Sequence, residues 1–153
     1  MIGEMRDATS FSAAMSAADT GHLVLSTLHT TNAAQSVTRI LDFFKSEERD
    51  QIRRQLAGTL KAVVCQRMVG RIGGGGIPAI EVLINTGTVR KLIEENRLEK
   101  LGAAIETGGE DGMQNFNQAL LTLVKDRLVT EEEALSKAAN ADALKMNFQG
   151  IFS

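Results

Sequence analysis

The chain has 153 residues, of which 43% are hydrophobic and 24% charged, a balance typical of a globular domain rather than a disordered tail. Its 17 basic and 19 acidic residues leave a formal net charge of −2, so its charge gives no reason to expect nucleic acid or an anionic membrane as a partner. The single cysteine excludes an internal disulfide and a cysteine-based zinc site, and no apolar run approaches the roughly 20 residues of a membrane span. We therefore expect a cytoplasmic domain without direct membrane insertion.

The first part of the chain alternates helix and strand patterns. Small residues favour a helix over Ala8–Asp19, with Asp7 or Thr9 available to cap its start. Residues 23–28, LVLSTL, are short and nearly all apolar, which is typical of a strand buried on both faces. Asn32 can then cap a helix with one apolar face. Helix, strand and helix in this order indicate a parallel sheet and an α/β fold.

The rest of the chain passes from a hairpin pattern to helices. Ser46 is expected to cap a long helix, and strand patterns follow at residues 64–69 and 79–84, joined by the GRIGGGGIP stretch of residues 70–78. From residue 86 the pattern is helical, and Thr130 can cap the last helix that we expect. The apolar residues that mark the three helices before it are Val89, Leu92 and Ile93; Leu98, Leu101 and Ile105; and Phe116, Leu120, Val124 and Leu128.

Two candidate catalytic groups follow the ends of strand patterns. In open α/β sheets, ligands bind beyond the carboxyl ends of the strands. Glu4 follows a short strand pattern at residues 1–2, and His29 follows residues 23–28. If these segments pair in parallel, both side chains emerge on one rim, where Glu4 could act as a general base towards water and His29 could donate to an anionic group. Taken singly, each residue is more often structural, so the prediction depends on the pair.

Other chemistry is disfavoured by the residues present. No Gly-Lys dipeptide occurs, so the 153 residues hold no phosphate-binding P-loop of the G-x-x-x-x-G-K type. The glycine run of residues 73–76 lies between two strand patterns and is expected to be a hairpin loop rather than a dinucleotide site. An extended path from His22 to His29 separates their Cα atoms by roughly 23 Å, which argues against a metal hydrolase built on the two histidines and Glu4.

Several of these segments resemble motifs of one ATPase family. GEMRD, residues 3–7, resembles the Walker B end of the secretion and type IV pilus ATPases, and TGHLVLSTLHT, residues 20–30, resembles their histidine box. EVLINTGTVRKLIEENR resembles the AIRNLIRE helix of PilT-type retraction ATPases, and TGGEDGMQNFNQALLTLV resembles the segment that follows it. The chain is thus similar, over nearly its whole length, to the C-terminal half of a PilT-like twitching-motility ATPase.

The resemblance implies an architecture and a set of residue roles. Residues 1–44 would be the end of a RecA-like P-loop ATPase core, residues 45–85 a long helix with a β-hairpin, and residues 86–153 a helical region. Glu4 would position or activate the attacking water, and His29 would lie near the γ-phosphate. The other residues that the resemblance assigns are His22, Thr30 and Asp7 at the nucleotide site, and Val89, Arg90, Leu92 and Ile93 on the helix tied to retraction.

The resemblance also implies cofactors and partners. It points to ATP and Mg²⁺, bound mainly through an upstream half, with no metal held directly by this chain, and we expect the chain alone to be inactive. A homo-hexamer acting on an inner-membrane pilus platform protein from the cytoplasmic face is implied. The single cysteine cannot build the four-cysteine zinc element of many assembly and secretion ATPases, which favours the retraction branch. A non-catalytic interaction module and an assembly or secretion ATPase are the alternatives.

Overall fold

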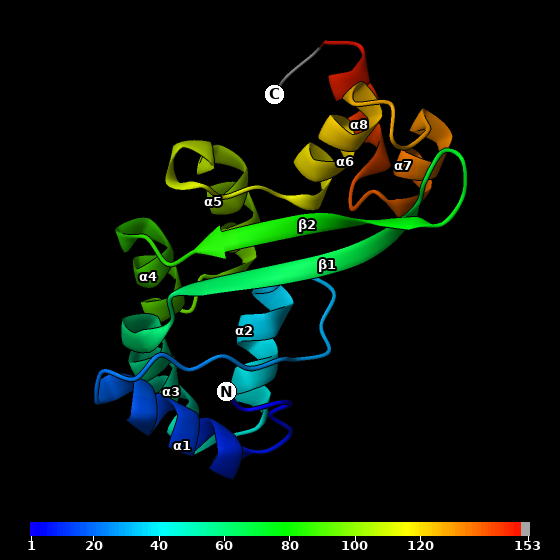
Figure 1. The fold of residues 1–153 in the computed structure, drawn as a ribbon. Coiled ribbons are helices and arrows are strands. Elements are labelled where there is room, and N and C mark those ends of the chain that lie inside the picture. The colour runs from blue at the N-terminus through cyan, green and yellow to red at the C-terminus, as the bar shows by residue number, and fades with distance from the viewer. Residues whose placement is uncertain (151–153) are drawn as a thin grey trace.

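The computed structural model describes residues 1–150, which fold into helices arranged around one antiparallel β-hairpin (Figure 1). None of the helices in these residues is both long and apolar enough to cross a membrane. In chain order the elements are α1 (Ala8–Asp19), α2 (Ala33–Asp42), α3 (Ser46–Thr59), β1 (Ala62–Gly70), β2 (Gly76–Ile84), α4 (Gly87–Glu94), η1 (Leu98–Lys100), α5 (Leu101–Thr107), η2 (Gly109–Asp111), α6 (Phe116–Lys125), α7 (Glu131–Lys137) and α8 (Ala141–Phe148).

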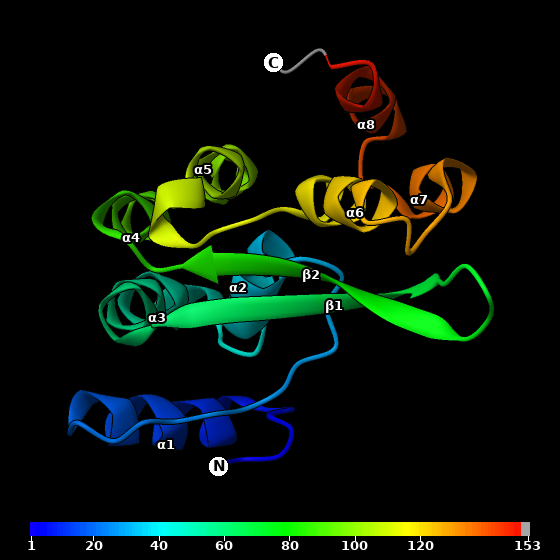
Figure 2. The same cartoon turned by 45° about the horizontal axis from the view of Figure 1, so that its top comes forward.

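The hairpin runs through the middle of the molecule. β1 and β2 pair from Ala62 with Ile84 to Gly70 with Gly76. Both strands are longer than expected, and the reversal narrows to residues 71–75, where three consecutive glycines adopt positive φ angles of 76° to 105° that other residues rarely adopt. Helices α5 to α8 lie on one side of the hairpin and α1 on the other, while α3 lies beside one end of β1 (Figure 2). The hairpin contacts α2, α5, α6 and α7, and α1 packs against α3.

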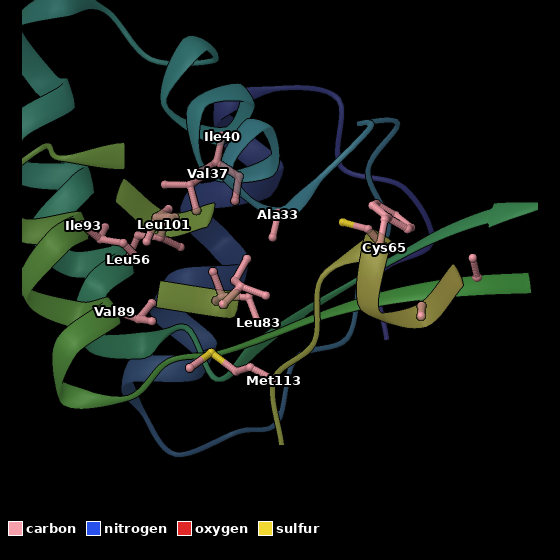
Figure 3. Close-up of a cluster of buried hydrophobic side chains, with 14 of the residues drawn as sticks. Ala33, Val37, Ile40, Leu56, Cys65, Leu83, Val89, Ile93, Leu101 and Met113 are labelled. Carbon is pink, nitrogen blue, oxygen red and sulfur yellow. The ribbon is translucent and has the colours of Figure 1, made fainter. Parts of the chain in front are cut away.

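One hydrophobic cluster joins α2, α3, α4 and α5 to the hairpin (Figure 3). Val37 of α2, Leu83 of β2, Val89 and Ile93 of α4 and Leu101 of α5 are fully buried. Burying one such side chain stabilises the fold by about 1.5–3 kcal/mol. The helical spacing of the members on α2, α4 and α5 predicted those helices, and the shared cluster holds α2 and α4 together with β2.

The expected buried strand at residues 23–28 is wrong for this chain. The segment is extended, but it forms only one parallel bridge, between Thr27 and Glu4. Leu23 and Leu25 are 76% and 57% exposed, although their apolar character predicted burial on both faces. Within the described residues only the stretch from Ile2 to Met5 pairs with this segment, through bonds such as Ile2 N–H to the Leu25 carbonyl at 2.9 Å. A strand is buried on both faces where it lies inside a sheet that is covered on both sides, and the short partner at residues 2–5 does not build such a sheet.

Three of the predicted helix caps are observed, and one is not. Asp7, Asn32 and Thr130 each accept a hydrogen bond from the backbone N–H three residues later, as expected. Ser46 does not: it is the first residue of α3, Lys45 occupies the cap position, and the Ser46 hydroxyl donates to the Glu47 carboxylate at 3.0 Å. Helix α8 was not predicted. Leu128 was expected to belong to the helix that contains Phe116, but that helix, α6, ends at Lys125.

Candidate functional site

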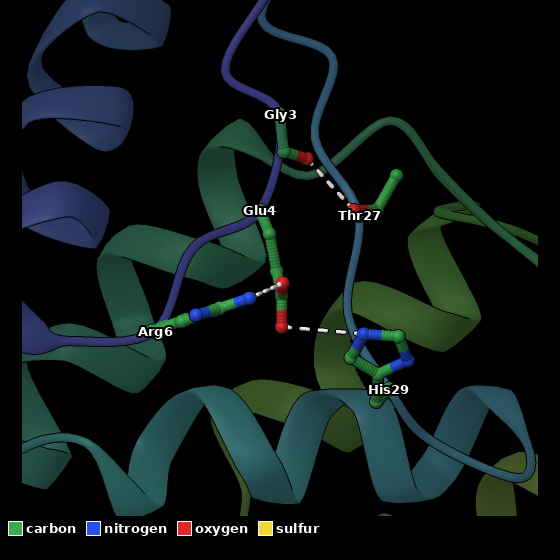
Figure 4. A network of polar contacts seen from close by, with 5 residues as sticks. All are labelled: Gly3, Glu4, Arg6, Thr27 and His29. Carbon is green, nitrogen blue, oxygen red and sulfur yellow. Dashed lines mark hydrogen bonds and ion pairs between the residues drawn. The ribbon is translucent and has the colours of Figure 1, made fainter.

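Glu4 and His29 meet because their two segments pair in parallel. The Thr27 N–H donates to the Gly3 carbonyl at 3.1 Å, and the Thr27 hydroxyl donates to the same oxygen at 2.7 Å (Figure 4). Two residues past this pairing, His29 turns towards Glu4, and its Nε2 lies 3.3 Å from Glu4 Oε1. The proximity expected from parallel strand ends is therefore observed. It joins a carboxylate and an imidazole that are 25 residues apart in the sequence.

Arg6 stabilises the ionised form of the Glu4 carboxyl. Its guanidinium donates to Glu4 Oε2 at 2.6 Å (Figure 4). This hydrogen bond is the main reason that the pKa of the Glu4 carboxyl lies below its ordinary value; slight burial opposes it, and the charges of Arg6 and His29 add to it. A glutamate carboxyl of ordinary pKa is already ionised at neutral pH, and the pairing with Arg6 extends the ionised form to lower pH. Its side chain is 25% exposed and that of His29 is 88% exposed, so both can reach a ligand from solvent.

The other three residues expected at the nucleotide site do not join this pair. His22 lies past the end of α1, where its Nδ1 is 3.1 Å from the Thr20 hydroxyl and 3.3 Å from the Ala17 carbonyl. Thr30 shares a 2.6 Å hydrogen bond with the Ser36 hydroxyl of α2. Asp7 accepts from Ser10 and caps α1. In this structure each of the three is engaged in local contacts that hold a helix end.

The acid dependence of stability tests the Asp7 cap. Mainly the backbone N–H of Ser10, and then its hydroxyl, hold the pKa of the Asp7 carboxyl below its ordinary value. A carboxyl whose pKa is lower in the folded state stabilises the fold above its unfolded pKa, and this stabilisation is lost as the pH falls through the folded pKa. We expect Asp7→Asn, which keeps an acceptor oxygen, to lose less free energy of unfolding than the wild type between about pH 5 and pH 2 in urea titrations. An equal loss in both would contradict a role for the ionised cap.

Helix α4, expected to be tied to retraction, has one buried and one exposed face. Val89 and Ile93 are fully buried, Leu92 is half-buried, and Arg90 is exposed. Arg53 of α3 donates to the Glu94 carbonyl at the end of α4 at 3.2 Å. The apolar residues of the motif therefore anchor the helix, and Arg90 is presented to solvent.

Sequence reasoning missed two polar residues on the inner face of the hairpin. Arg67 of β1 contacts the segment that follows His29, and Glu81 of β2 contacts the start of α2. A carboxylate within the apolar stretch GIPAIEVLI of β2 was the one available signal. In the part of the chain that the structure describes, no three His, Cys, Asp or Glu side chains are grouped so that they could hold a metal ion.

Comparisons with known proteins agree with this architecture. Residues 1–75, which include both the Glu4 and the His29 segments, match the family described as Type II/IV secretion system protein. The chain is 42% identical over 138 residues to the type IV pilus retractation ATPase PilT of Pseudomonas aeruginosa, covering 90% of this chain and 40% of PilT. It is 39% identical over 145 residues to a twitching motility protein of Neisseria gonorrhoeae, covering 94% of this chain and 39% of that protein.

The three-dimensional comparison gives the same likeness. The fold matches the crystal structure of the pilus retraction motor PilT with bound ADP, with a TM-score of 0.82 and 37% identity over 94% of this chain and 40% of that one. The chain is a relative of the C-terminal part of PilT-like ATPases. It spans about 40% of the length of these PilT relatives. The expected α/β fold with its hairpin and helical C-terminal part is confirmed by this match.

Proposed function

We propose that the chain is the C-terminal portion of a hexameric ATPase motor that hydrolyses ATP to drive type IV pilus retraction and twitching motility. The observation that carries the proposal is the pairing of the Glu4 carboxylate with His29 Nε2, 3.3 Å apart on adjoining parallel segments, in a fold that matches a retraction motor crystallised with ADP. The names of the PilT and twitching-motility relatives supply the biological process.

The two side chains have complementary roles in phosphoryl transfer to water. The ionised Glu4 accepts the proton of the attacking water, or orients that water, as a general base. The exposed His29 donates a hydrogen bond to a phosphate oxygen as charge develops there. Mg²⁺ bound with the phosphates of ATP would neutralise part of that charge. We propose that a P-loop upstream of these residues holds the phosphates, since the 153 residues contain none.

A chimaera tests this proposal. The 153 residues are substituted for the matching C-terminal part of P. aeruginosa PilT, which supplies the P-loop half, and ATP turnover is compared with that of the chain alone. We expect turnover within about tenfold of intact PilT for the chimaera, because the Glu4 and His29 pair completes the site, and negligible turnover for the chain alone. A chimaera that elutes as a hexamer and binds ATP without hydrolysing it would contradict the proposal.

The same chimaera separates hydrolysis from movement. We propose that Arg90 acts in retraction rather than in ATP turnover, because it lies on the exposed face of α4 while Val89 and Ile93 anchor the helix. Arg90→Ala should leave turnover within about twofold and abolish twitching of cells that carry the chimaera as their only retraction motor. Arg54→Ala, an exposed arginine of α3, is the matched control and should leave both intact. Parallel losses of turnover and twitching in Arg90→Ala would contradict separate roles.

Assembly and location belong to the same proposal. We propose that residues 1–44 contribute to the ATPase core, that residues 45–85 and 86–153 transmit its movement, and that six copies act from the cytoplasmic face on an inner-membrane platform protein. A non-catalytic interaction module is the second candidate. It predicts a chimaera that assembles but hydrolyses no ATP. An assembly or secretion ATPase is the third, and predicts turnover without rescue of twitching.

A further inference from the structure

Arg67 and Glu81 hold the segment that directly follows His29. Arg67 Nη2 donates to the Thr31 carbonyl at 3.1 Å. Two residues further on, the Ala33 N–H at the start of α2 donates to Glu81 Oε1 at 2.8 Å. Both side chains come from the inner face of the hairpin, 36 and 48 residues away in the sequence from the groups that they bind. Distant residues therefore hold the backbone after His29, together with the local hydrogen bond of the Thr31 hydroxyl to Gln35 Oε1 at 2.6 Å.

The same two side chains also contact the helical C-terminal region. Arg67 Nη1 donates to the Lys137 carbonyl at the end of α7 at 3.2 Å, and its guanidinium lies 4.0 Å from the ring centroid of Phe116, the first residue of α6. The backbone N–H of Phe116 also favours the ionised form of Glu81 and lowers the pKa of its carboxyl. One arginine and one carboxylate thus link the segment after His29 to the starting residue of α6 and the end of α7.

Glu81 occupies an unusual place for a carboxylate. It is 7% exposed on a mainly apolar strand, and this burial raises the pKa of its carboxyl, while the Ala33 N–H and the charge of Arg67 oppose the shift. A buried charge is costly unless it is paired and hydrogen-bonded, and helix N-termini are favourable partners for a carboxylate. Glu81 has such a hydrogen-bonded partner at the start of α2, and the backbone N–H of Phe116 at the start of α6 also favours its charged form.

The position of His29 depends on this backbone. Among residues 1–150 the His29 side chain has one polar contact, with Glu4, and it is 88% exposed. Its place is consequently set by the path of its main chain, which is held on its C-terminal side by the contacts of Thr30, Thr31 and Ala33. A shift of about 1 Å in a catalytic group can lower a rate a hundredfold. The contacts that fix the backbone after His29 therefore affect how well the His29 side chain is placed.

We propose that Arg67 and Glu81 are positioning residues, which hold His29 against Glu4 and make its position depend on where α6 and α7 lie. The inference rests on the proposed ATPase function for its effect on turnover. Its structural part, the hold on residues 31–33, stands independently of that function and can be measured on this chain.

The first measurement is kinetic and uses the chimaera. Arg67→Met should lower kcat about tenfold to a hundredfold with KM within about twofold, and Arg67→Lys should recover part of the loss. In a His29→Ala background, Arg67→Met should cost nothing further, because a residue that acts through His29 has nothing left to position. Arg71→Met, an exposed arginine of the hairpin turn, is the matched control and should leave kcat unchanged. Additive losses, or no loss from His29→Ala itself, would overturn the positioning role.

The second measurement needs no ATPase activity. In the 153-residue chain, Glu81→Leu should speed amide hydrogen exchange of Ala33 at least about tenfold, and Glu81→Gln, which keeps one acceptor oxygen, should do so less. Arg71→Met should leave that rate unchanged. Unchanged exchange of Ala33 in Glu81→Leu would overturn the hold on α2. A chimaera that fails to turn over ATP with all its residues intact would instead count against the proposed function, so the two failures are distinguishable.

Discussion

Glu4→Gln in the chimaera should reduce ATP turnover by about a hundredfold to ten-thousandfold while nucleotide affinity changes by less than about threefold. The substitution keeps the size of the side chain and an acceptor oxygen but removes the basic carboxylate that would accept a proton from water. The carboxylate is ionised over the whole neutral range, as an ordinary glutamate is, and the Arg6 guanidinium lowers its pKa further. Turnover is measured at saturating ATP, and affinity by fluorescence of a labelled ATP analogue.

Two comparisons make this result specific to Glu4. Glu99→Gln, at an exposed site in η1, removes the same charge and should leave turnover and affinity intact. Arg6→Met removes the hydrogen-bond donor to Glu4 and should cost less than Glu4→Gln, because the carboxylate itself remains. A Glu4→Gln variant that loses nucleotide binding together with turnover would assign Glu4 a structural role in place of a catalytic one.

Leu83→Ala should lower the free energy of unfolding of the 153-residue chain by about 2–5 kcal/mol. Leu83 is fully buried on β2 in the cluster that also holds Val37 of α2 and Val89 of α4 (Figure 3). Truncation there removes apolar contact and leaves a cavity at the junction of the hairpin with two helices. Because domains are stable by only about 5–15 kcal/mol, the loss is a large share of the total.

The control for Leu83 lies on the other face of the hairpin. Val64 of β1 is 65% exposed, so Val64→Ala removes little buried surface and should change stability by less than about 0.5 kcal/mol. Urea unfolding followed by circular dichroism measures both variants. A loss below about 1 kcal/mol for Leu83→Ala would mean that the hairpin and the helices do not depend on a shared core.

The sequence predicts those parts of the fold that short-range physics determines. Asp7, Asn32 and Thr130 each find their bonding partner three residues away, so the residue type and its place before an apolar helix suffice. The run at residues 23–28 fails for the opposite reason. An apolar run indicates burial but does not say which strands will flank it, and in this chain one short neighbour leaves Leu23 and Leu25 exposed.

In the candidate site, too, some contacts could be predicted from the sequence and others could not. Parallel strand ends predicted that Glu4 and His29 would lie together, since general topology places them on one rim. The same reasoning could not foresee that Thr30 would bond Ser36. Nor could it find Arg67, whose partners Thr31 and Lys137 are 36 and 70 residues away and carry no pattern that links them to β1. Contacts of this kind follow from the packing of the hairpin and are visible only in the folded chain.

A crystal structure of the chimaera with Mg²⁺ and a non-hydrolysable ATP analogue tests the central claim most directly. We predict that the Glu4 carboxylate lies within hydrogen-bond distance, about 2.6–3.2 Å, of a water placed to attack the γ-phosphate, and that the His29 ring faces an oxygen of the same phosphate. A structure in which the carboxylate of another residue contacts that water, with Glu4 and His29 turned away from the phosphates, would contradict the assignment of this pair as the catalytic half of the site.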